Sequence, residues 1–563
     1  MDADQWQLGA RWCGTGRTEF LVWAPHARRV DVRLLGPREQ VVPFSPCGQG
    51  YYAAAVHDSA PGAHYFYRLD DRLERADPAS RLQPSGVNGP SEIVDSAFDW
   101  HDADWPGLAL ADYVLYELHV GTFSPEGTLA GVIGQLDRLV ELGITAIELM
   151  PLAQFPGSRN WGYDGVYPWA VQNSYGGPRE LKRLVDACHR RGLGVVLDVV
   201  YNHLGPEGNY LSDFGPYFNA QHQTPWGPAI NFEGPDSDAV RRYFLDSALM
   251  WVREFHVDGL RLDAIHAIVD RSARPFLTEL SDRVHAAAAE LGRPVQLIAE
   301  NNRNDPRIFA AAQRGGLGLD AQWLDDFGRA LQGRLTGERT GFYADFGWVA
   351  DIAAAWRGGY VLDGRYSNYR RRKHGASSSA VPRERFFVYS QMHDQVGNRP
   401  QSDRLSTLVG LEQLKLAAAT ILLSPYQPLL FMGEEYGEPA PFHYFVSHLD
   451  PGLIERVRAG RRREFAAFHW QKEPADPQAD STFAASRLNH DLARSGWHAV
   501  LWNFYRELLR LRRELPAPAC GSKSINQGAA LGTAKTLSWE SPPLLAAARA
   551  DQNGQALVLF NFG

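Results

Sequence analysis

The chain has 563 residues, 44% of them hydrophobic, and a formal net charge of −8. This length exceeds what one hydrophobic core usually serves, so two to four domains are expected. Lysine and arginine are spread through the chain and no basic run offers a surface that tracks phosphates, which argues against nucleic acid as a partner. No apolar stretch approaches the length of a membrane span, so a membrane is not expected as a partner either.

The amino terminus is acidic and polar and lacks an apolar signal-peptide region, so the sequence predicts a cytoplasmic protein. The four cysteines have no CxxC spacing, which argues against a disulfide framework and a zinc site. No oxygen-ligand spacing of the EF-hand type occurs, so we expect no metal and no cofactor. The 16 tryptophans and 22 tyrosines suit both apolar packing and stacking on sugar rings.

The front of the chain, residues 1–105, is predicted to be an all-β domain of the sandwich type. Its short runs alternate apolar and polar residues, and proline and glycine occupy the gaps. The clearest of these runs are residues 20–23, 30–34 and 63–68. Segments rich in proline, glycine and asparagine then mark the end of this domain.

Residues 106–485 are predicted to form a (β/α)8 TIM barrel with insertions and an extension. Short apolar runs alternate with longer helical segments, the pattern of strands in a parallel sheet. Eight such strands, each followed by a helix, is the number that closes a barrel. The predicted strands are residues 113–120, 144–152, 194–203, 259–268, 295–301, 320–326, 385–394 and 428–435.

The end of the barrel domain, residues 437–485, is expected to be an irregular, arginine-rich extension. Residues 486–563 are predicted to hold an amphipathic helix at 497–515 and a small carboxyl-terminal β domain with strands at 536–539 and 556–560. Two strands are few for a closing sheet, which favours a truncated carboxyl-terminal domain.

The fourth predicted strand carries an arginine and an aspartate among apolar residues. Alternate residues of a strand share a face, so Arg261 and Asp263 project the same way. A guanidinium beside a carboxylate favours the ionised form, and an ionised aspartate at a strand end is suited to act as a nucleophile. Considered alone, the pair is better explained as a structural ion pair.

Other strand ends supply further acids and histidines. The third strand ends in Asp198 and His203, the fifth in Glu300, and the seventh in His393 and Asp394. Barrel active sites lie at the carboxyl ends of the strands, so Asp263, Glu300 and Asp394 are expected to converge. Crowded carboxylates raise the pKa of at least one, which gives the ionised nucleophile and protonated acid that glycoside cleavage needs.

These four strand ends resemble, in order, the four short sequence regions of the α-amylase superfamily of glycoside hydrolases. The resemblance implies that Asp263 is the nucleophile that forms a glycosyl-enzyme and that Glu300 is the general acid and then base. It also implies that Asp394 holds sugar hydroxyls and stabilises the transition state.

The same resemblance assigns substrate-binding roles to neighbouring residues. Arg261, His203 and His393 are implied to position the nucleophile and the sugar being cleaved. Tyr163, in the segment from Asn160 to Asp164, is implied to stack on that sugar. Asp198 matches a position that supports the site from below.

Further segments resemble the maltooligosyltrehalose trehalohydrolases within this superfamily: residues 202–210, 224–227, 320–327, 395–400 and 431–439. The resemblance implies hydrolysis of the α-1,4 bond next to the terminal trehalose of maltooligosyltrehalose, with release of trehalose, by a retaining double displacement. The implied partners are maltooligosyltrehalose and related α-glucans, together with functional pairing with the maltooligosyltrehalose synthase that makes this substrate.

Recognition of the trehalose that leaves requires residues on the leaving-group side. The candidates are His266, Asp325, Asp326 and Arg399, with Gln395 and Asn398 as further substrate-binding residues. A charge pair with a nearby arginine is the alternative for Asp325 and Asp326. Two tryptophans, Trp226 and Trp323, are candidate stacking surfaces, and packing between a loop and the barrel explains either of them equally well.

The sequence departs from the family pattern at three places. Met392 stands where asparagine commonly precedes the His-Asp pair, and Gly328 stands where histidine often follows Asp-Asp-Phe. Asn301 and Asn302 follow Glu300 where Ser-Asp is more familiar. No catalytic carboxylate is lost, but loss of the asparagine and the histidine removes sugar contacts, so we expect effects on turnover rate and on acceptor-side preference.

Two other functions are compatible with parts of this pattern. A glycogen or α-glucan branching enzyme shares the sandwich, the barrel and the three acids but transfers the glycosyl group to a sugar hydroxyl. The loop from Gly205 to Tyr210 favours the hydrolase. A non-catalytic α-glucan-binding protein is the alternative of another class, and the presence of all three carboxylates argues against it.

Overall fold

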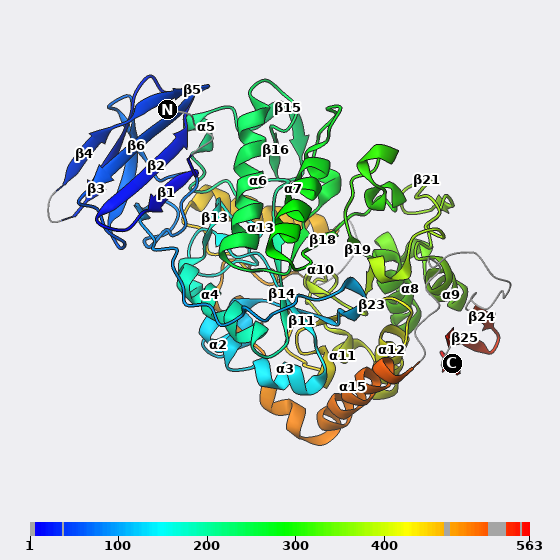
Figure 1. Ribbon diagram of the computed structural model, residues 1–563. Coiled ribbons are helices and arrows are strands. Elements are labelled where there is room, and N and C mark those ends of the chain that lie inside the picture. Colours follow the sequence, from blue (N-terminus) through cyan, green and yellow to red (C-terminus); the bar gives the residue numbers. More distant parts are fainter. Residues whose placement is uncertain (1–5, 37–38, 467–472, 516–535, 552–553) are drawn as a thin grey trace.

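The computed structural model describes residues 6–36, 39–466, 473–515, 536–551 and 554–563. A β-sandwich comes first, a large α/β barrel fills the centre, and a small sheet lies near the carboxyl end (Figure 1). The predicted order of β-sandwich, barrel and small β domain is confirmed.

The front sandwich consists of two antiparallel sheets. One sheet has the strand order β1-β2-β6-β5, and the other has the order β4-β3-β7-β8 with β9 paired to β7. Side chains from both sheets meet in the core, where the rings of Phe20 and Tyr65 pack edge to face with centroids 5.1 Å apart. The strands are β1 (Gly9–Trp12), β2 (Arg17–Trp23), β3 (Val30–Leu35), β4 (Gln40–Pro43), β5 (Ser45–Gly48), β6 (Tyr51–His57), β7 (His64–Leu69), β8 (Leu73–Arg75) and β9 (Ser91–Glu92).

Eight parallel strands close the central barrel, as predicted. Every residue of these strands is buried, the pattern expected when helices cover a parallel sheet on its outer side and side chains fill the interior. In order they are β10 (Leu115–Leu118), β11 (Ala146–Leu149), β14 (Gly194–Val199), β17 (Gly259–Leu262), β18 (Gln296–Ala299), β19 (Ala321–Trp323), β22 (Phe386–Val388) and β23 (Gln427–Phe431).

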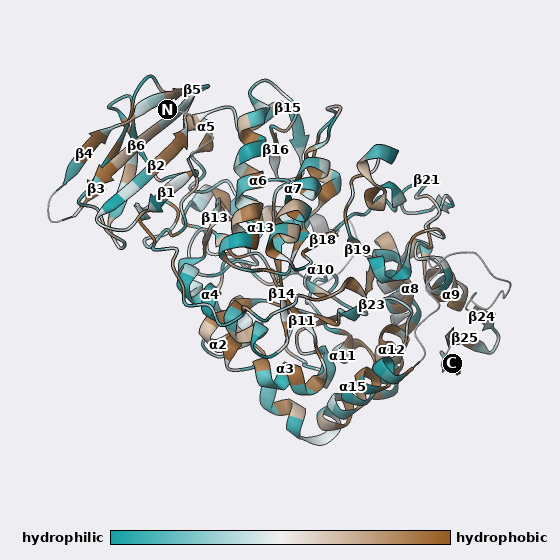
Figure 2. Cartoon of the chain, in the orientation of Figure 1, coloured by the Kyte–Doolittle hydropathy of each residue, from teal (hydrophilic) through white to brown (hydrophobic). Residues whose placement is uncertain are grey.

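The barrel strands are connected mainly by α-helices, which alternate hydrophobic and hydrophilic bands along their length (Figure 2). The main helices are α2 (Leu129–Ile133), α3 (Leu136–Leu142), α4 (Gly177–His189), α6 (Ser237–Glu254), α7 (Phe276–Leu291), α8 (Asp325–Thr336), α9 (Val349–Gly358) and α12 (Leu411–Leu422). Among the described residues no helix is long and apolar enough to cross a membrane.

One expectation about these connections is wrong. We expected a helix after each strand, but the segment between β18 and β19 forms only two 3-10 turns, Pro306–Phe309 and Ala312–Arg314. Gly315 and Gly318 in this segment have positive φ angles of 75° and 71°, which a continuous α-helix does not permit. Its backbone groups are satisfied by bonds within the loop instead, such as Leu319 N–H to the Ile308 carbonyl at 2.9 Å.

Two hairpins rise above the barrel on the side where the strands end. The first pairs β12 (Ala153–Gln154) with β13 (Tyr167–Val171), and the second pairs β15 (Phe218–Thr224) with β16 (Gly227–Ile230). The turn of the second hairpin places Trp226 at its tip. These hairpins therefore supply walls to the mouth of the barrel.

The carboxyl-terminal part differs from prediction in detail. The expected helix is present as α15 (Gly496–Glu514), but the segment expected to be irregular contains α13 (Pro451–Ala466) and α14 (Asp480–Ala485). The small sheet has three strands: β24 (Thr536–Glu540), β25 (Pro543–Asp551) and β26 (Gly554–Asn561). Strand β25 was missed because it is rich in alanine, which has weak β propensity.

Candidate active site

Three neighbouring strands of the barrel, β14, β17 and β18, bring predicted site residues to one mouth. In the parallel register, Asp198 of β14 lies beside Arg261 of β17, and Arg261 lies beside Ile298 of β18. Asp263 follows β17 and Glu300 follows β18, so both carboxylates leave adjacent strands at the same edge. This arrangement agrees with the general position of active sites in such barrels.

Asp263 is held by donors on both carboxylate oxygens. Arg261 Nη1 donates to Oδ1 at 2.8 Å, and Asn202 Nδ2 donates to Oδ2 at 2.7 Å. Only 9% of the residue is exposed. Charge-assisted hydrogen bonds of this kind fix the direction of the carboxylate, which is the requirement for an attacking nucleophile.

Arg261 is completely buried in the barrel interior. Its Nη1 also donates to both oxygens of Asp198, at 2.9 and 2.8 Å, and its guanidinium lies over the Trp323 ring at 4.4 Å. Burial opposes its charge most strongly, but the neighbouring Asp198, Tyr163, Asp263 and Glu300 together outweigh burial and raise the pKa of Arg261. The pair seen in the sequence is therefore part of a larger buried network.

Glu300 is positioned through an unusual backbone turn. Ala264, the residue after Asp263, has φ 39° and ψ 49°, a left-handed conformation that costs free energy for a residue other than glycine. This turn lets the Ala264 N–H donate to Glu300 Oε2 at 2.6 Å. The strained residue thus links the two carboxylates that the reaction needs.

The environment of Glu300 favours its protonated form. Burial, followed by the negative charges of Asp263, Asp325 and Asp394, raises the pKa of Glu300 to about 8 against the opposing charge of Arg261. A carboxylic acid that remains protonated at neutral pH can donate a proton to a leaving group. The geometry therefore favours Glu300 as the acid and Asp263 as the nucleophile.

This difference predicts the pH dependence of activity. Glu300 must carry its proton in the free enzyme, so kcat/KM is expected to fall about tenfold per pH unit above a pKa near 8. A kcat/KM profile between pH 5 and 10, with stability checked at each pH, measures this. An alkaline limb centred near pH 5, the ordinary range of a glutamate, would contradict the assignment.

His393 is fixed from below by a residue that the sequence reasoning missed, Glu117 of β10. One Glu117 oxygen bonds to His393 Nδ1, and the other accepts from the His393 backbone N–H at 3.1 Å. Burial opposes a charge on His393, but the charges of Glu117 and Asp394 raise its pKa to about 9. His393 is therefore an imidazolium, with both ring nitrogens as donors.

A continuous chain of hydrogen bonds joins this imidazolium to the nucleophile. His393 Nε2 donates to the Tyr163 hydroxyl at 2.9 Å, and that hydroxyl donates to Asp198 Oδ2 at 2.7 Å. Asp198 in turn is bonded to Arg261, which holds Asp263. Glu117 could have been found by the argument that singled out Arg261, because it is a charged residue within an apolar barrel strand.

The substitution Glu117→Gln tests this chain. Loss of the negative charge lowers the pKa of His393, and we expect kcat/KM at pH 7 to fall about tenfold, since a charge-assisted hydrogen bond contributes about 1.5 kcal/mol. The Cε1 chemical shift of His393, followed by NMR on 13C-histidine-labelled protein with His393→Gln as the assignment control, reports the pKa directly. An unchanged titration of His393 would refute the role given to Glu117.

Asp394 is the most open of the three acids, with 44% of its side chain exposed. It lies on the short helix α10 (His393–Gly397), and Asn398 Nδ2 donates to its Oδ1 at 3.1 Å. Met392 precedes this helix, and its sulfur accepts from the N–H groups of Asp394 and Gln395 at 3.1 and 3.4 Å. The thioether thus occupies the N-cap position where asparagine is the stronger acceptor.

The glycine at position 328 is explained by its neighbours. A Cβ atom there would lie 2.8 Å from Tyr389 Cε2 and 2.9 Å from Gln395 Nε2, closer than real contacts allow. A histidine therefore does not fit while Tyr389 and Gln395 keep their positions. The departure at Gly328 is coupled to the large side chains that surround it.

Trp226 covers the site from the tip of the second hairpin. Its ring stacks on His203 with centroids 4.8 Å apart and an interplanar angle of 16°, and 49% of the residue is exposed. His203 Nε2 donates to the Tyr163 carbonyl at 2.9 Å. An exposed aromatic face over a site histidine is consistent with the predicted stacking surface.

Of the candidate residues for the leaving-group side, Asp325 and His266 lie near the catalytic acids, whereas Arg399 is paired with another side chain. Asp325 contributes to the charge environment of Glu300, and His266 feels the charges of Asp263 and Asp325 and accepts at Nε2 from Asn302 Nδ2 at 3.2 Å. Asp325 also pairs with Arg329 at 2.6 Å, the charge pair considered as its alternative. Arg399 Nη1 donates to Glu338 at 2.7 Å.

The side chains of Asp326 and Trp323 are not placed to contact a substrate. Asp326 is 1% exposed, and its Oδ2 accepts from Asn304 Nδ2 and from the N–H groups of Val361 and Leu362, at 2.8 to 2.9 Å. This favours a structural role for Asp326. Trp323 is completely buried against Arg261, so of its two alternatives the structure supports packing and not stacking on a sugar. Periodicity alone cannot tell which face of a strand-end residue remains open.

The closed barrel with these carboxylates is the fold and site of an α-amylase-type glycoside hydrolase. The family model described as the α-amylase catalytic domain matches residues 85–226, and the model for carbohydrate-binding module 48, the isoamylase N-terminal domain, matches residues 7–80. A solved structure titled as a putative α-amylase from Salmonella typhimurium has a TM-score of 0.90 and 39% identity, covering 99% of this chain and 93% of the other.

Curated relatives identify the family within this class. Malto-oligosyltrehalose trehalohydrolase from Saccharolobus solfataricus is 46% identical over 90% of this chain and 87% of the relative. The enzyme of the same name from Arthrobacter ramosus is 47% identical over 89% and 88%. The chain belongs to the malto-oligosyltrehalose trehalohydrolase family. A 1,4-alpha-glucan branching enzyme from Bacillus caldolyticus is more distant, at 28% identity over 76% of the chain.

Proposed function

We propose that this protein hydrolyses the α-1,4-glucosidic bond next to the terminal trehalose of maltooligosyltrehalose and releases trehalose. The observation that carries the proposal is the Arg261–Asp263–Glu300 cluster, in which a held carboxylate lies beside a protonated acid, in a chain about 46% identical to trehalohydrolases. Substrate binding of the α-glucan type agrees with the family models.

The reaction proceeds in two displacements. Asp263 attacks C1 of the glucose at the scissile bond while Glu300 protonates the glycosidic oxygen, so that trehalose leaves and a covalent glycosyl-enzyme forms. Glu300, now a carboxylate, removes a proton from water, and the resulting hydroxide displaces Asp263 from C1. The maltooligosaccharide is released with the α configuration retained, and Glu300 has regained its proton.

The residues around the cleaved sugar supply the remaining functions. Asp394 is open enough to accept hydrogen bonds from sugar hydroxyls, and the His393 imidazolium beside it, oriented by Glu117 and Tyr163, holds a positive charge at this side of the site. The Tyr163 ring stacks on that of His393, and His203 is held against the Tyr163 carbonyl, so these two residues continue the same wall. We assign His266, Asp325 and Arg399 to the trehalose side, together with Gln395 and Asn398 next to Asp394.

Trp226 is predicted to act in binding rather than in chemistry. Substitution Trp226→Ala is expected to raise KM by about 3- to 10-fold with little change in kcat, because an aromatic contact contributes about 1 kcal/mol and Trp226 touches none of the carboxylates. Steady-state kinetics on maltotriosyltrehalose measures both constants, with Trp348→Ala, another exposed tryptophan, as the control. An unchanged KM with a large loss of kcat would contradict the stacking role.

We further propose that the protein acts in the cytoplasm, after a second enzyme that makes its substrate. Its substrate carries an α,α-1,1 linkage at one end, so a synthase that converts the terminal α-1,4 bond of a maltooligosaccharide into that linkage must act first. We propose functional pairing with this maltooligosyltrehalose synthase, without the need for a lasting complex.

Product analysis separates hydrolysis from the branching alternative. Chromatography of a digest of maltotriosyltrehalose is expected to show trehalose and maltotriose in equal amounts. Incubation with amylose is expected to leave no new α-1,6 linkages, as assayed with a debranching enzyme. New branches without trehalose release would instead assign the chain to glycosyl transfer.

A further inference from the structure

The arginine-rich extension of the barrel contacts the active site through Arg461 of α13. Its Nη1 donates to Asn398 Oδ1 at 3.0 Å, and its Nη2 donates to the Gly397 carbonyl at 2.9 Å. Arg461 is half-buried, and its guanidinium lies over the Tyr444 ring, 4.8 Å from the ring centroid. Because a guanidinium is a planar fork with donors in fixed directions, these acceptors and the aromatic face hold it in one place.

Asn398 connects this guanidinium to the third acid, Asp394. Its Nδ2 donates to Asp394 Oδ1 at 3.1 Å, and among the described side chains Asn398 is the one that donates a hydrogen bond to this carboxylate. His393 Nε2 lies 3.6 Å from the same oxygen, beyond hydrogen-bond distance. The Asp394 side chain is 44% exposed, so packing does not fix its direction. That direction therefore depends on how Asn398 is held.

Arg461 determines which way round the amide of Asn398 is turned. A guanidinium has donors only, so it requires the amide oxygen on its own side, and the amide NH2 group then faces Asp394. The reverse orientation would bring two donors together and would place the amide oxygen against a carboxylate. Arg461 therefore keeps a donor, and not an acceptor, beside Asp394.

Arg461 also holds the backbone that carries Asp394. Gly397 is the last residue of α10, and the carbonyl of a last helical residue has no partner within its helix, so a cationic donor there is favourable. The other end of α10 is capped only by the Met392 sulfur, a weak acceptor. We propose that Arg461 is a positioning residue, which directs the Asp394 carboxylate at the sugar through Asn398 and the end of α10. This inference rests on the reaction proposed above.

The substitution Arg461→Met tests this positioning. We expect kcat on maltotriosyltrehalose to fall about tenfold with KM little changed, because a carboxylate that stabilises the transition state loses its fixed direction while the other substrate contacts remain. Steady-state kinetics on the full chain measures both constants, and thermal unfolding checks that the variant is folded. An unchanged kcat in Arg461→Met would overturn the proposal.

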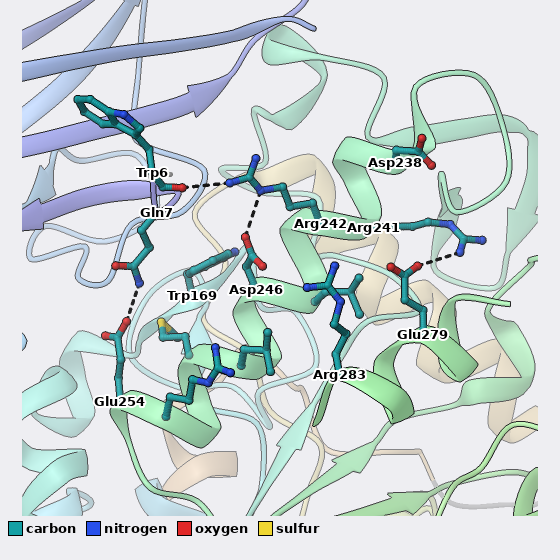
Figure 3. Close-up of a pocket in the computed structure, with 14 residues that line it drawn as sticks. Trp6, Gln7, Trp169, Asp238, Arg241, Arg242, Asp246, Glu254, Glu279 and Arg283 are labelled. Carbon is teal, nitrogen blue, oxygen red and sulfur yellow. Dashed lines mark hydrogen bonds and ion pairs between the residues drawn. The ribbon is translucent and has the colours of Figure 1, made fainter. Parts of the chain in front are cut away.

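The matched control is Arg242→Met on α6, at a cavity of about 630 Å3 beside the front sandwich (Figure 3). Arg242 is half-buried like Arg461 and has the same kinds of partner. Figure 3 shows it bonded to a side chain, Asp246 at 3.4 Å, and to a backbone carbonyl, that of Trp6 at 3.0 Å. Its guanidinium also lies over a tyrosine ring, that of Tyr51. We expect this variant to keep both kinetic constants; a loss of kcat equal to that of Arg461→Met would refute the specific role of Arg461.

A double substitution separates positioning from a general effect on folding. In Asn398→Ala the connection to Asp394 is already absent, so the further change Arg461→Met is expected to lower kcat by less than about threefold. A purely structural role of Arg461 would give the same loss in both backgrounds and would overturn the proposal. If the unmodified chain cut maltooligosaccharides without releasing trehalose, the proposed function would fail, and the same comparison on those substrates would still decide the role of Arg461.

Discussion

Replacement of Asp263 by asparagine is expected to reduce kcat for trehalose release by about 10^4-fold or more, the size of effect seen when a covalent nucleophile is removed. The amide cannot form the glycosyl-enzyme, although it fills the same space between Arg261 and Asn202. Single-turnover kinetics on maltotriosyltrehalose measures the loss. Binding of the substrate is expected to be retained, because Asp394 and His393 keep their positions.

The control for Asp263→Asn has to separate chemistry from folding. Asp263 is buried against Arg261, so its loss leaves the arginine with Asp198 as its nearest partner and lowers the melting temperature. Asp282→Asn, at the surface pair with Arg274, is the matched change outside the site. Activity within tenfold of the unmodified enzyme in a folded Asp263→Asn variant would refute its role as nucleophile.

Substitution Glu300→Gln is expected to lower kcat/KM by about 10^2- to 10^4-fold, the range attributed to general acid catalysis, and to remove the alkaline limb near pH 8. Glutamine keeps an acceptor for the Ala264 N–H but has no proton to transfer. Steady-state kinetics from pH 5 to 10 on both proteins measures these effects.

The nature of the leaving group supplies a sharper control for Glu300. A maltosyl fluoride releases fluoride without protonation by an acid, so glycosyl-enzyme formation from it is expected to be nearly normal in Glu300→Gln, whereas release of trehalose is not. Glu290→Gln, at a surface pair with Arg253, is the matched change that leaves both reactions intact. Equal losses on both substrates would contradict acid catalysis by Glu300.

Two kinds of pattern in the sequence predict the structure: charged residues within apolar strands, and apolar runs that recur between helical segments. Arg261 and Asp263 stand out because charged residues occupy an apolar strand, and the structure places them in one buried network with Asp198. The eight barrel strands are predicted because their apolar runs recur between helical segments. Glu117 carries the same signal, but its partner His393 is distant in the sequence, so its role is defined only when the fold brings β10 and α10 together.

Other features depend on three-dimensional contacts that no local pattern records. Asp325 and Asp326 are neighbours in the sequence, yet only Asp325 reaches the environment of Glu300, because Asp326 turns toward the backbone of residues 361–362. Trp226 and Trp323 are equal candidates for stacking by residue type, but one lies at a hairpin tip and the other under Arg261. Which face of a residue stays open is decided by packing.

The central claim is that one site cuts the bond beside trehalose with retention at C1. It is tested most directly by proton NMR of maltotriosyltrehalose in the first minutes after enzyme is added, before the anomers equilibrate. Resonances of trehalose and of α-maltotriose are expected to rise together, in equal amounts. Early formation of β-maltotriose, or of maltose and glucose without trehalose, would contradict the account.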